Sequence, residues 1–157
     1  MIESHDYQVE LIGVDEKRGM LTASEDGLPE LEVSSPPEFG GPGRRWSPEH
    51  LFVASVSSCL MTTFRSIAAR SGVEVIDYVD TAVGHLQRGE DGAYSIERIT
   101  LRPRVVVSSQ TRLDRVQRVL ERADRACLIS RSVASEVTVE PVISHAHEME
   151  HAVVAER

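Results

Sequence analysis

The sequence has few aromatic residues, few cysteines and no excess of positive charge. Of its 157 residues, 4% are aromatic and two are cysteines, while 17 Lys and Arg stand against 25 Asp and Glu, which gives a formal net charge of −8. Binding to nucleic-acid phosphates requires a surplus of Lys and Arg on some face of a protein. We therefore expect no nucleic-acid partner.

Targeting and membrane-spanning segments are also lacking. Residues 1–6 show no basic stretch followed by an apolar one, and no apolar run approaches the roughly 20 residues that cross a bilayer. These absences predict a cytoplasmic protein with no membrane partner. In a reducing compartment two cysteines favour catalytic or redox use over a structural disulfide, although two inert buried thiols fit the composition equally well.

The length and the apolar content of 41% fit a single domain over residues 1–157. In the first third of the chain, apolar and polar residues alternate, which predicts a meander of three short strands over 7–11, 20–23 and 31–33. Proline and glycine are too frequent within residues 36–45 for regular structure. A surface loop is expected there.

A long helix is predicted after this loop. The tripeptide Ser-Pro-Glu at 47–49 supplies an N-cap hydroxyl, a proline at the first helical position and an acid in the first turn. The helix should run to about Arg70 and end at Gly72. With histidine counted as neutral, positions 50–64 carry no charge and apolar or small residues occur on every side, which indicates a central helix covered by other elements. Cys59 lies in its middle.

The second half of the chain predicts further strands on either side of a second helix. β-branched residues are frequent over 75–83 and 96–107, and a last strand is expected over 136–143. The order of strands and helices predicts an α+β fold in which antiparallel sheets enclose two central helices.

The second helix is expected to begin near Thr111, because residues 111–114 resemble a capping box. Its apolar stripe steps by three and four, and one more step of four places Cys127 on the buried face at the helix end; the stripe comprises Leu113, Val116, Leu120 and Ala123. After the last strand, residues 145–157 are expected to form a flexible or extended tail. Its histidines make a metal site conceivable, but a solvated tail is favoured because a terminal segment rarely supplies the geometry that zinc requires.

No group near Cys59 in the sequence would lower the pKa of its thiol. Neither a histidine nor a charge lies within one turn, and burial alone raises a thiol pKa. A nucleophilic role therefore requires a cation from elsewhere in the fold. Arginine suits this role because its planar guanidinium can bind a thiolate and a carboxylate at once. The candidates are Arg18, Arg44, Arg45 and Arg65.

The two cysteine-containing segments carry a family resemblance. Residues 40–59 read as a glycine-rich loop, Ser-Pro-Glu and a helix that reaches the first cysteine, and residues 126–133 read Ala-Cys-Leu-Ile-Ser-Arg-Ser-Val. Both segments resemble the OsmC/Ohr family (osmotically inducible protein C and organic hydroperoxide resistance protein), in its general OsmC-like branch. The resemblance implies a cysteine-based organic hydroperoxide reductase, an intertwined homodimer with no bound metal or cofactor, regenerated by an external dithiol such as that of a lipoyl protein.

The resemblance also implies roles for individual residues. Cys59 is the thiolate that attacks the peroxide, and Cys127 is the resolving thiol. Glu49 is the carboxylate partner of an active-site arginine, and Arg18 occupies the position of that arginine, with the two loop arginines as alternatives. Leu128 stands where the family motif has proline, so the geometry of the resolving turn is expected to differ.

The spacing of Glu49 and Cys59 adds a constraint. Ten residues of continuous helix rise about 15 Å, which is beyond the reach of one arginine bridging both side chains. Either the helix begins or bends after Glu49, or the site draws residues from two chains. The homodimer that the resemblance implies favours the second option.

An apolar pocket that favours alkyl peroxides is expected near Cys59, because burying each methylene contributes about 0.8 kcal/mol. Its residues are predicted to be Leu51, Phe52, Val56 and Phe64. The alternative function is a non-catalytic, dimeric binding protein of the same fold, whose cysteines are idle or sense redox state. A metal-binding protein that uses the histidine tail is a third hypothesis.

Overall fold

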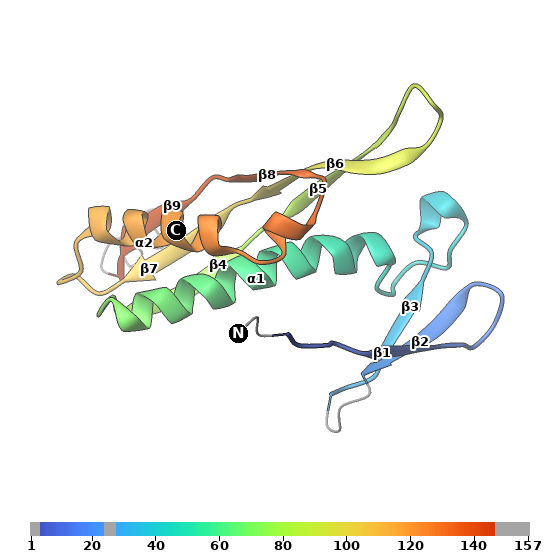
Figure 1. Cartoon of the computed structure of the whole chain (residues 1–157), viewed down its shortest axis with the longest axis horizontal. Helices are drawn as coiled ribbons and strands as arrows, with labels where there is room; N and C mark the ends of the chain where they lie inside the picture. The colour runs from blue at the N-terminus through green and yellow to red at the C-terminus, as the bar shows by residue number, and fades with distance from the viewer. Residues whose placement is uncertain (1–3, 24–27, 147–157) are drawn as a thin grey trace, which may run out of the picture. The chain divides into compact units, whose positions relative to one another are not determined.

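A computed structural model describes residues 4–23 and 28–146 (Figure 1). By its internal contacts the chain forms two compact units, residues 1–52 and residues 53–157. One helix, α1 (Pro48–Arg70), continues from the first unit into the second. The expectation of a single domain stays a prediction, because units joined by a continuous helix can still fold together.

The N-terminal unit contains the predicted meander. Strands β1 (Val9–Gly13), β2 (Arg18–Ala23) and β3 (Leu31–Ser34) form an antiparallel sheet in the order β1-β2-β3. Every residue of β1 is exposed, including Leu11 at 63% and Ile12 at 53% of their full surface. The alternation of the sequence therefore predicted the strand, but the side chains that it marked as core are uncovered in this chain.

The loop before α1 depends on Gly41. Its amide donates to the carbonyl of Pro36 (3.0 Å), and a Cβ at this position would lie 1.6 Å from the carbonyl oxygen of Ser35. We expect Gly41→Ala to lower the free energy of unfolding by about 1–3 kcal/mol, because the backbone must move to admit the methyl group. Urea unfolding followed by the fluorescence of Trp46, the only tryptophan, measures this effect.

Gly13→Ala is the matched control. A Cβ at Gly13 meets nothing within 4 Å, so this variant should unfold at the urea concentration of the wild type. Equal midpoints for the two variants would contradict the proposed clash.

Helix α1 begins and ends where the sequence predicts. The Ser47 carbonyl accepts the first helical hydrogen bond, from the amide of Leu51 (3.0 Å), and the Ser47 hydroxyl accepts from the amide of His50 (3.3 Å). After Arg70 the chain leaves the helix through Gly72, whose φ of 63° is in the left-handed region that favours glycine. By length and composition α1 could cross a membrane, which is weak evidence because the core helices of soluble proteins pass the same test.

The C-terminal unit contains two three-stranded mixed sheets, ordered β4-β7-β9 and β5-β6-β8. Each predicted long strand is divided between the two sheets. Strand β8 pairs in parallel with β6, and β9 pairs in parallel with β7. The sheets are therefore mixed, whereas antiparallel sheets were expected. The strands are β4 (Val75–Asp80), β5 (Val83–Arg88), β6 (Tyr94–Leu101), β7 (Pro103–Val107), β8 (Glu136–Val139) and β9 (Val142–His145).

Polar contacts hold the point where the chain passes from one sheet to the other. Asp80, the last residue of β4, accepts from the amide of Arg102 (2.7 Å) between β6 and β7, and from the hydroxyl of Ser57 on α1 (2.5 Å). The Arg102 side chain pairs with Glu140 (2.9 Å), which lies between β8 and β9. Pro141 follows and has no amide hydrogen for a ladder, so the chain changes partners there.

Helix α2 (Leu113–Ala126) begins later than the sequence suggested. The capping-box prediction was wrong, because Arg112 is the N-cap without a side-chain hydrogen bond and the Thr111 hydroxyl pairs with that of Ser108 (3.0 Å) instead. The predicted apolar stripe is confirmed at its centre and reaches Cys127, which is completely buried. The buried residues of α2 are Val116, Val119, Leu120 and Ala123.

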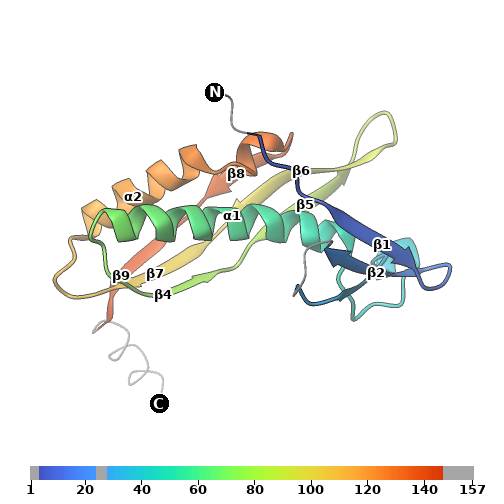
Figure 2. The same ribbon diagram turned by 60° about the horizontal axis from the view of Figure 1, so that its bottom comes forward.

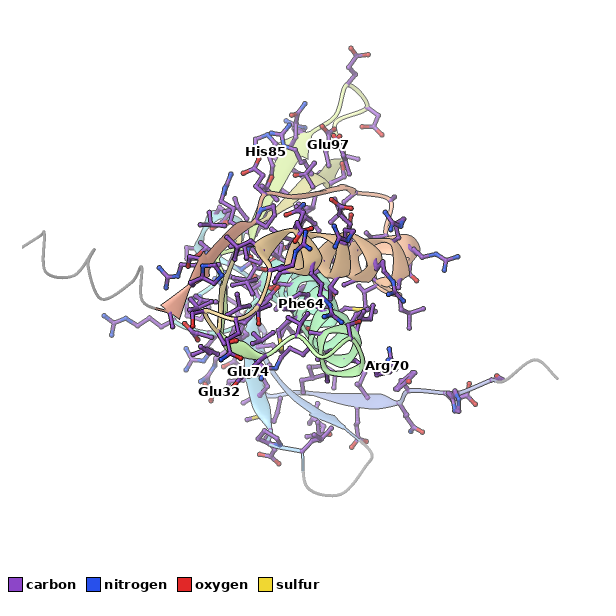
Figure 3. All side chains as sticks on the ribbon, turned by 90° about the vertical axis from the view of Figure 1, so that its left-hand side faces the viewer. Glu32, Phe64, Arg70, Glu74, His85 and Glu97 are labelled. Atoms are coloured by element: carbon purple, nitrogen blue, oxygen red, sulfur yellow. The ribbon has the colours of Figure 1, made fainter. Side chains whose placement is uncertain are left out.

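In the C-terminal unit both helices lie on the same side of the strands (Figure 2). Phe64 of α1 is completely buried and lies in the interior of the unit (Figure 3). The α+β class is confirmed, with mixed sheets. His145 is the last residue of β9 and bonds through Nε2 with the carbonyl of Thr111 (2.9 Å), so the expected tail begins after it, and residues 147–157 lie outside the described part of the chain.

Candidate functional site

The two cysteines meet within the C-terminal unit. Cys59 lies in the middle of α1 and is partly exposed, whereas Cys127 caps the end of α2 and is completely buried. Both are free thiols. The two thiols are neighbours, because each of them shifts the pKa of the other. The structure therefore brings together two residues that are 68 positions apart in the sequence.

The pKa of Cys59 is lowered below its ordinary value. Burial alone acts in the opposite direction, but hydrogen bonds from the backbone of Ile129, the thiol of Cys127, the hydroxyl of Thr63 and the backbone of Leu128 together outweigh it. Neutral donors therefore lower this pKa, and the expected cation stays a prediction.

The pKa of Cys127 is raised. Burial is the largest cause, and the neighbouring Cys59 sulfur adds to it, while the backbone amide and hydroxyl of Ser130 act in the opposite direction. The Ser130 hydroxyl is buried beside the Cys127 sulfur at a geometry short of a regular hydrogen bond, and it has no other partner among the described residues. Cys59 is therefore the thiol that ionises first, and Cys127 loses its proton only at higher pH.

Tyr78 is a neighbour of this pair that sequence reasoning missed. Its hydroxyl is buried without a hydrogen-bond partner in the described structure, and its ring packs against that of Phe64 with centroids 5.7 Å apart. Burial, the charge of Asp80 and the charge of Cys127 raise the pKa of Tyr78 above its usual range, so the phenol stays neutral. Nothing in the alternation of β4 distinguishes Tyr78 from other half-buried strand residues.

Arg18 and Glu49 belong to the N-terminal unit. Arg18 pairs with Asp15 (2.5 Å), whose pKa is lowered by the amide of Lys17 and the Arg18 guanidinium. Glu49 has a buried carboxylate oxygen, Oε2, with no partner among the described residues. A buried carboxylate oxygen without a hydrogen-bond donor lowers the stability of the fold, so Glu49 is a candidate to accept a hydrogen bond from a group outside the described residues.

The alternative arginines have other surroundings. Arg45 pairs with Glu32 (2.7 Å), and Arg44 is exposed with a φ of 57°. Arg65 is exposed on α1, six residues beyond Cys59 and therefore on another side of the helix. The role of Arg18 and that of its alternatives stay predictions.

Two of the four predicted pocket residues are core side chains. Val56 and Phe64 are both completely buried, because they face the interior of the C-terminal unit rather than its surface. Both side chains pack the core in this structure, and their role in substrate contact stays a prediction. Leu51 and Phe52 are partly exposed and stay candidates.

Helix α1 decides between the two explanations for the spacing of Glu49 and Cys59. The helix starts before Glu49 and runs as one element through Cys59, so the option that it begins after Glu49 was wrong. The rise between the two residues is about 15 Å. One arginine does not bridge this rise along a straight helix, and a site shared with a second chain stays a prediction.

Comparisons with known proteins agree with this fold. The family model for OsmC-like protein matches residues 41–142. An OsmC-like protein of unknown function from Vibrio cholerae is 28% identical, with a TM-score of 0.79 over 88% of this chain and 100% of that one. A search of curated proteins finds no match.

Two organic hydroperoxide resistance proteins also share the fold. One, from Elizabethkingia anophelis, is 19% identical, with a TM-score of 0.70 over 92% of this chain and 99% of its own. The other, OhrB of Bacillus subtilis, is 21% identical, with a TM-score of 0.65 over 88% of this chain and 98% of its own. Because the family model covers more than half of the sequence, this chain belongs to the OsmC-like protein family.

Proposed function

We propose that this chain is a thiol-dependent peroxidase that reduces organic hydroperoxides to alcohols. The observation that carries the proposal is that Cys59 and Cys127 are neighbours in one chain, because a resolving thiol must lie close to the thiol that it resolves. The lowered pKa of Cys59 fits a nucleophile, and the raised pKa of Cys127 fits a partner that keeps its proton. The names of two proteins of the same fold add support.

The reaction balances with these two thiols. The Cys59 thiolate attacks the distal oxygen of ROOH, the O–O bond breaks, and the alkoxide takes up a proton and leaves as ROH. Cys59 is then a sulfenic acid. Cys127 attacks its sulfur and water leaves, so that the two cysteines are oxidised to a disulfide while the peroxide is reduced. An external dithiol, such as that of a lipoyl protein, reduces the disulfide by exchange.

A homodimer is part of the proposal. The exposed apolar residues of β1 are of the kind that marks a protein contact, and they include Val9 at 66% exposure. On α1, small hydroxyl residues at 58, 62 and 66 are exposed along one side, which would let a second helix approach closely. A second copy of the chain would cover both surfaces.

The second copy would also complete the site. The buried Glu49 oxygen has no partner among the described residues, and an arginine held by it can support a thiolate of the other chain. In this proposal Arg18 exchanges its exposed pairing with Asp15 for Glu49, which costs little because exposed ion pairs contribute about 0–1 kcal/mol. No bound cofactor is needed, and the need for free thiols favours a cytoplasmic location.

A thiol titration tests the function. One equivalent of cumene hydroperoxide per chain should consume both thiols within seconds and give an intramolecular disulfide between Cys59 and Cys127, identified by mass spectrometry of the peptides. Cumene hydroperoxide that leaves both thiols free would contradict the proposal and favour the binding-protein alternative. Hydrogen peroxide at the same concentration should react more slowly, because it has no alkyl group to bury.

A further inference from the structure

A hollow lined by arginines lies where the end of α1 and the first turns of α2 are side by side (Figures 1 and 2). Its volume is about 360 Å³, and it lies wholly within the C-terminal unit. Small-molecule sites in proteins have volumes of about 300–1,000 Å³, so this hollow is large enough for a ligand. We call it the arginine hollow, and its lining residues are Ser71, Arg115, Arg118, Val119 and Arg122.

The three arginines of the hollow lie on one side of α2. Positions 115, 118 and 122 are spaced by three and four, which places them within about 60° of one another around the helix axis. Side chains at these spacings are neighbours, and like charges there destabilise a helix. The chain has a formal net charge of −8, so a general excess of positive charge does not explain three neighbouring cations. An anion bound between them would offset their repulsion.

Contacts within the unit hold two of the arginines in place. Arg115 donates through Nη2 to the carbonyl of Ser71, and Arg118 donates through Nη1 to Asp114 (2.9 Å). Each contact uses one N–H of a guanidinium that has five, so most of the donors are left for a ligand. Within residues 4–23 and 28–146, Arg122 has no hydrogen bond or ion pair. Side chains that are arranged in advance lose less freedom when a ligand binds.

The carboxylates next to the hollow do not neutralise it. Asp114 also pairs with Arg112 (3.0 Å), so its single charge is shared between two arginines. Glu121 accepts from the side-chain amide of Gln117 (3.1 Å) and does not line the hollow. None of the lining residues is acidic. A surplus of positive charge therefore surrounds the hollow.

We propose that the arginine hollow binds the diphosphate group of a soluble small molecule. Arginine forks suit phosphate because their paired N–H groups match two of its oxygens. The three arginines extend over a rise of about 10 Å along α2, so two linked phosphates reach more of them than one phosphate does. The proposal does not rest on the proposed peroxidase function, because neither cysteine lines the hollow.

Titration calorimetry with inorganic pyrophosphate, at constant ionic strength, tests the hollow. The wild type should bind one pyrophosphate per chain, and Arg122→Gln should weaken binding at least about tenfold, because hydrogen bonds between guanidinium and phosphate are charge-assisted. Arg104→Gln is the matched control. It makes the same change in charge at an exposed residue of β7 outside the hollow, and its affinity should stay within about twofold of the wild type, because salt screens separated surface charges.

Three results would overturn the proposal. The first is no saturable binding of pyrophosphate up to about 10 mM, and the second is equal affinity in the wild type and in Arg122→Gln. The third is that malonate, a dicarboxylate, binds as tightly as pyrophosphate, which would reject selectivity for phosphate.

Vesicles of phosphatidylcholine with phosphatidic acid separate a lipid source of phosphate from a soluble one. In a sedimentation assay the protein should stay in the supernatant. Sedimentation with these vesicles that Arg122→Gln abolishes would keep the arginines as phosphate ligands but overturn the soluble ligand.

Discussion

Replacing Cys59 with serine is expected to lower kcat/KM for cumene hydroperoxide by at least about 10³-fold, because removing a nucleophile removes the whole covalent route. A serine hydroxyl at this position would receive the same donors that favour the Cys59 thiolate, but it would remain protonated at neutral pH. Peroxide consumption with dithiothreitol as reductant measures the loss. Turnover that survives in Cys59→Ser would rule out the mechanism.

Cys127→Ser is the matched comparison, because it removes the second thiol and leaves the first. Its first turnover should still release one equivalent of alcohol, and the sulfenic acid on Cys59 should persist and react with dimedone. The attack of Cys59 on the peroxide should be slower than in the wild type, since the Cys127 thiol is one of the donors that lower the pKa of Cys59. Equal sulfenic acid in the wild type and in Cys127→Ser would argue against Cys127 as the resolving thiol.

Local signals in the sequence predicted the helices well. Helix α1 follows from an N-cap serine, a proline that fits the first helical position and a glycine that fits the left-handed end, and each of these acts within one turn. The apolar stripe of α2 extended to Cys127 because a helix keeps its period, and this placed the second cysteine on the buried face before any contact was known.

The sheets were harder to predict, because their pattern depends on distant partners. The run 96–107 reads as one strand, but the chain changes sheet at Arg102, whose amide bonds to Asp80, 22 positions earlier. Likewise, the parallel pairing of β8 with β6 and of β9 with β7 requires the chain to return past α2. Periodicity marks such residues as strand but carries no information on which other strand they pair with.

The pKa of Cys59 shows a different limit of prediction from the sequence. Reading side chains in the sequence predicts a cation, since no charged neighbour lies within a turn. Two of the donors at the sulfur are backbone amides, which every residue except proline has, so residue types give no sign of them. Only the fold, which brings residues 127–129 near Cys59 in the middle of α1, reveals them.

Co-expressing Glu49→Ala and Cys59→Ser chains is expected to restore peroxidase activity that each variant lacks alone. The continuous helix puts about 15 Å between these residues, so a site that uses both should take Glu49 from one chain and Cys59 from the other. A mixed dimer then contains one complete site. With random pairing, half of the dimers are mixed, which gives about a quarter of the wild-type activity per chain.

The matched control pairs Cys59→Ser with Cys127→Ser. These two thiols are neighbours within one chain, so every site of the mixed dimer lacks one of them, and no activity beyond that of the separate variants should return. Differently tagged chains, purified through both tags, ensure that mixed dimers are assayed. Recovery in the control pair would place Cys59 and Cys127 of one site on separate chains, whereas no recovery in the Glu49→Ala pair would show that the site draws no Glu49 from the second chain.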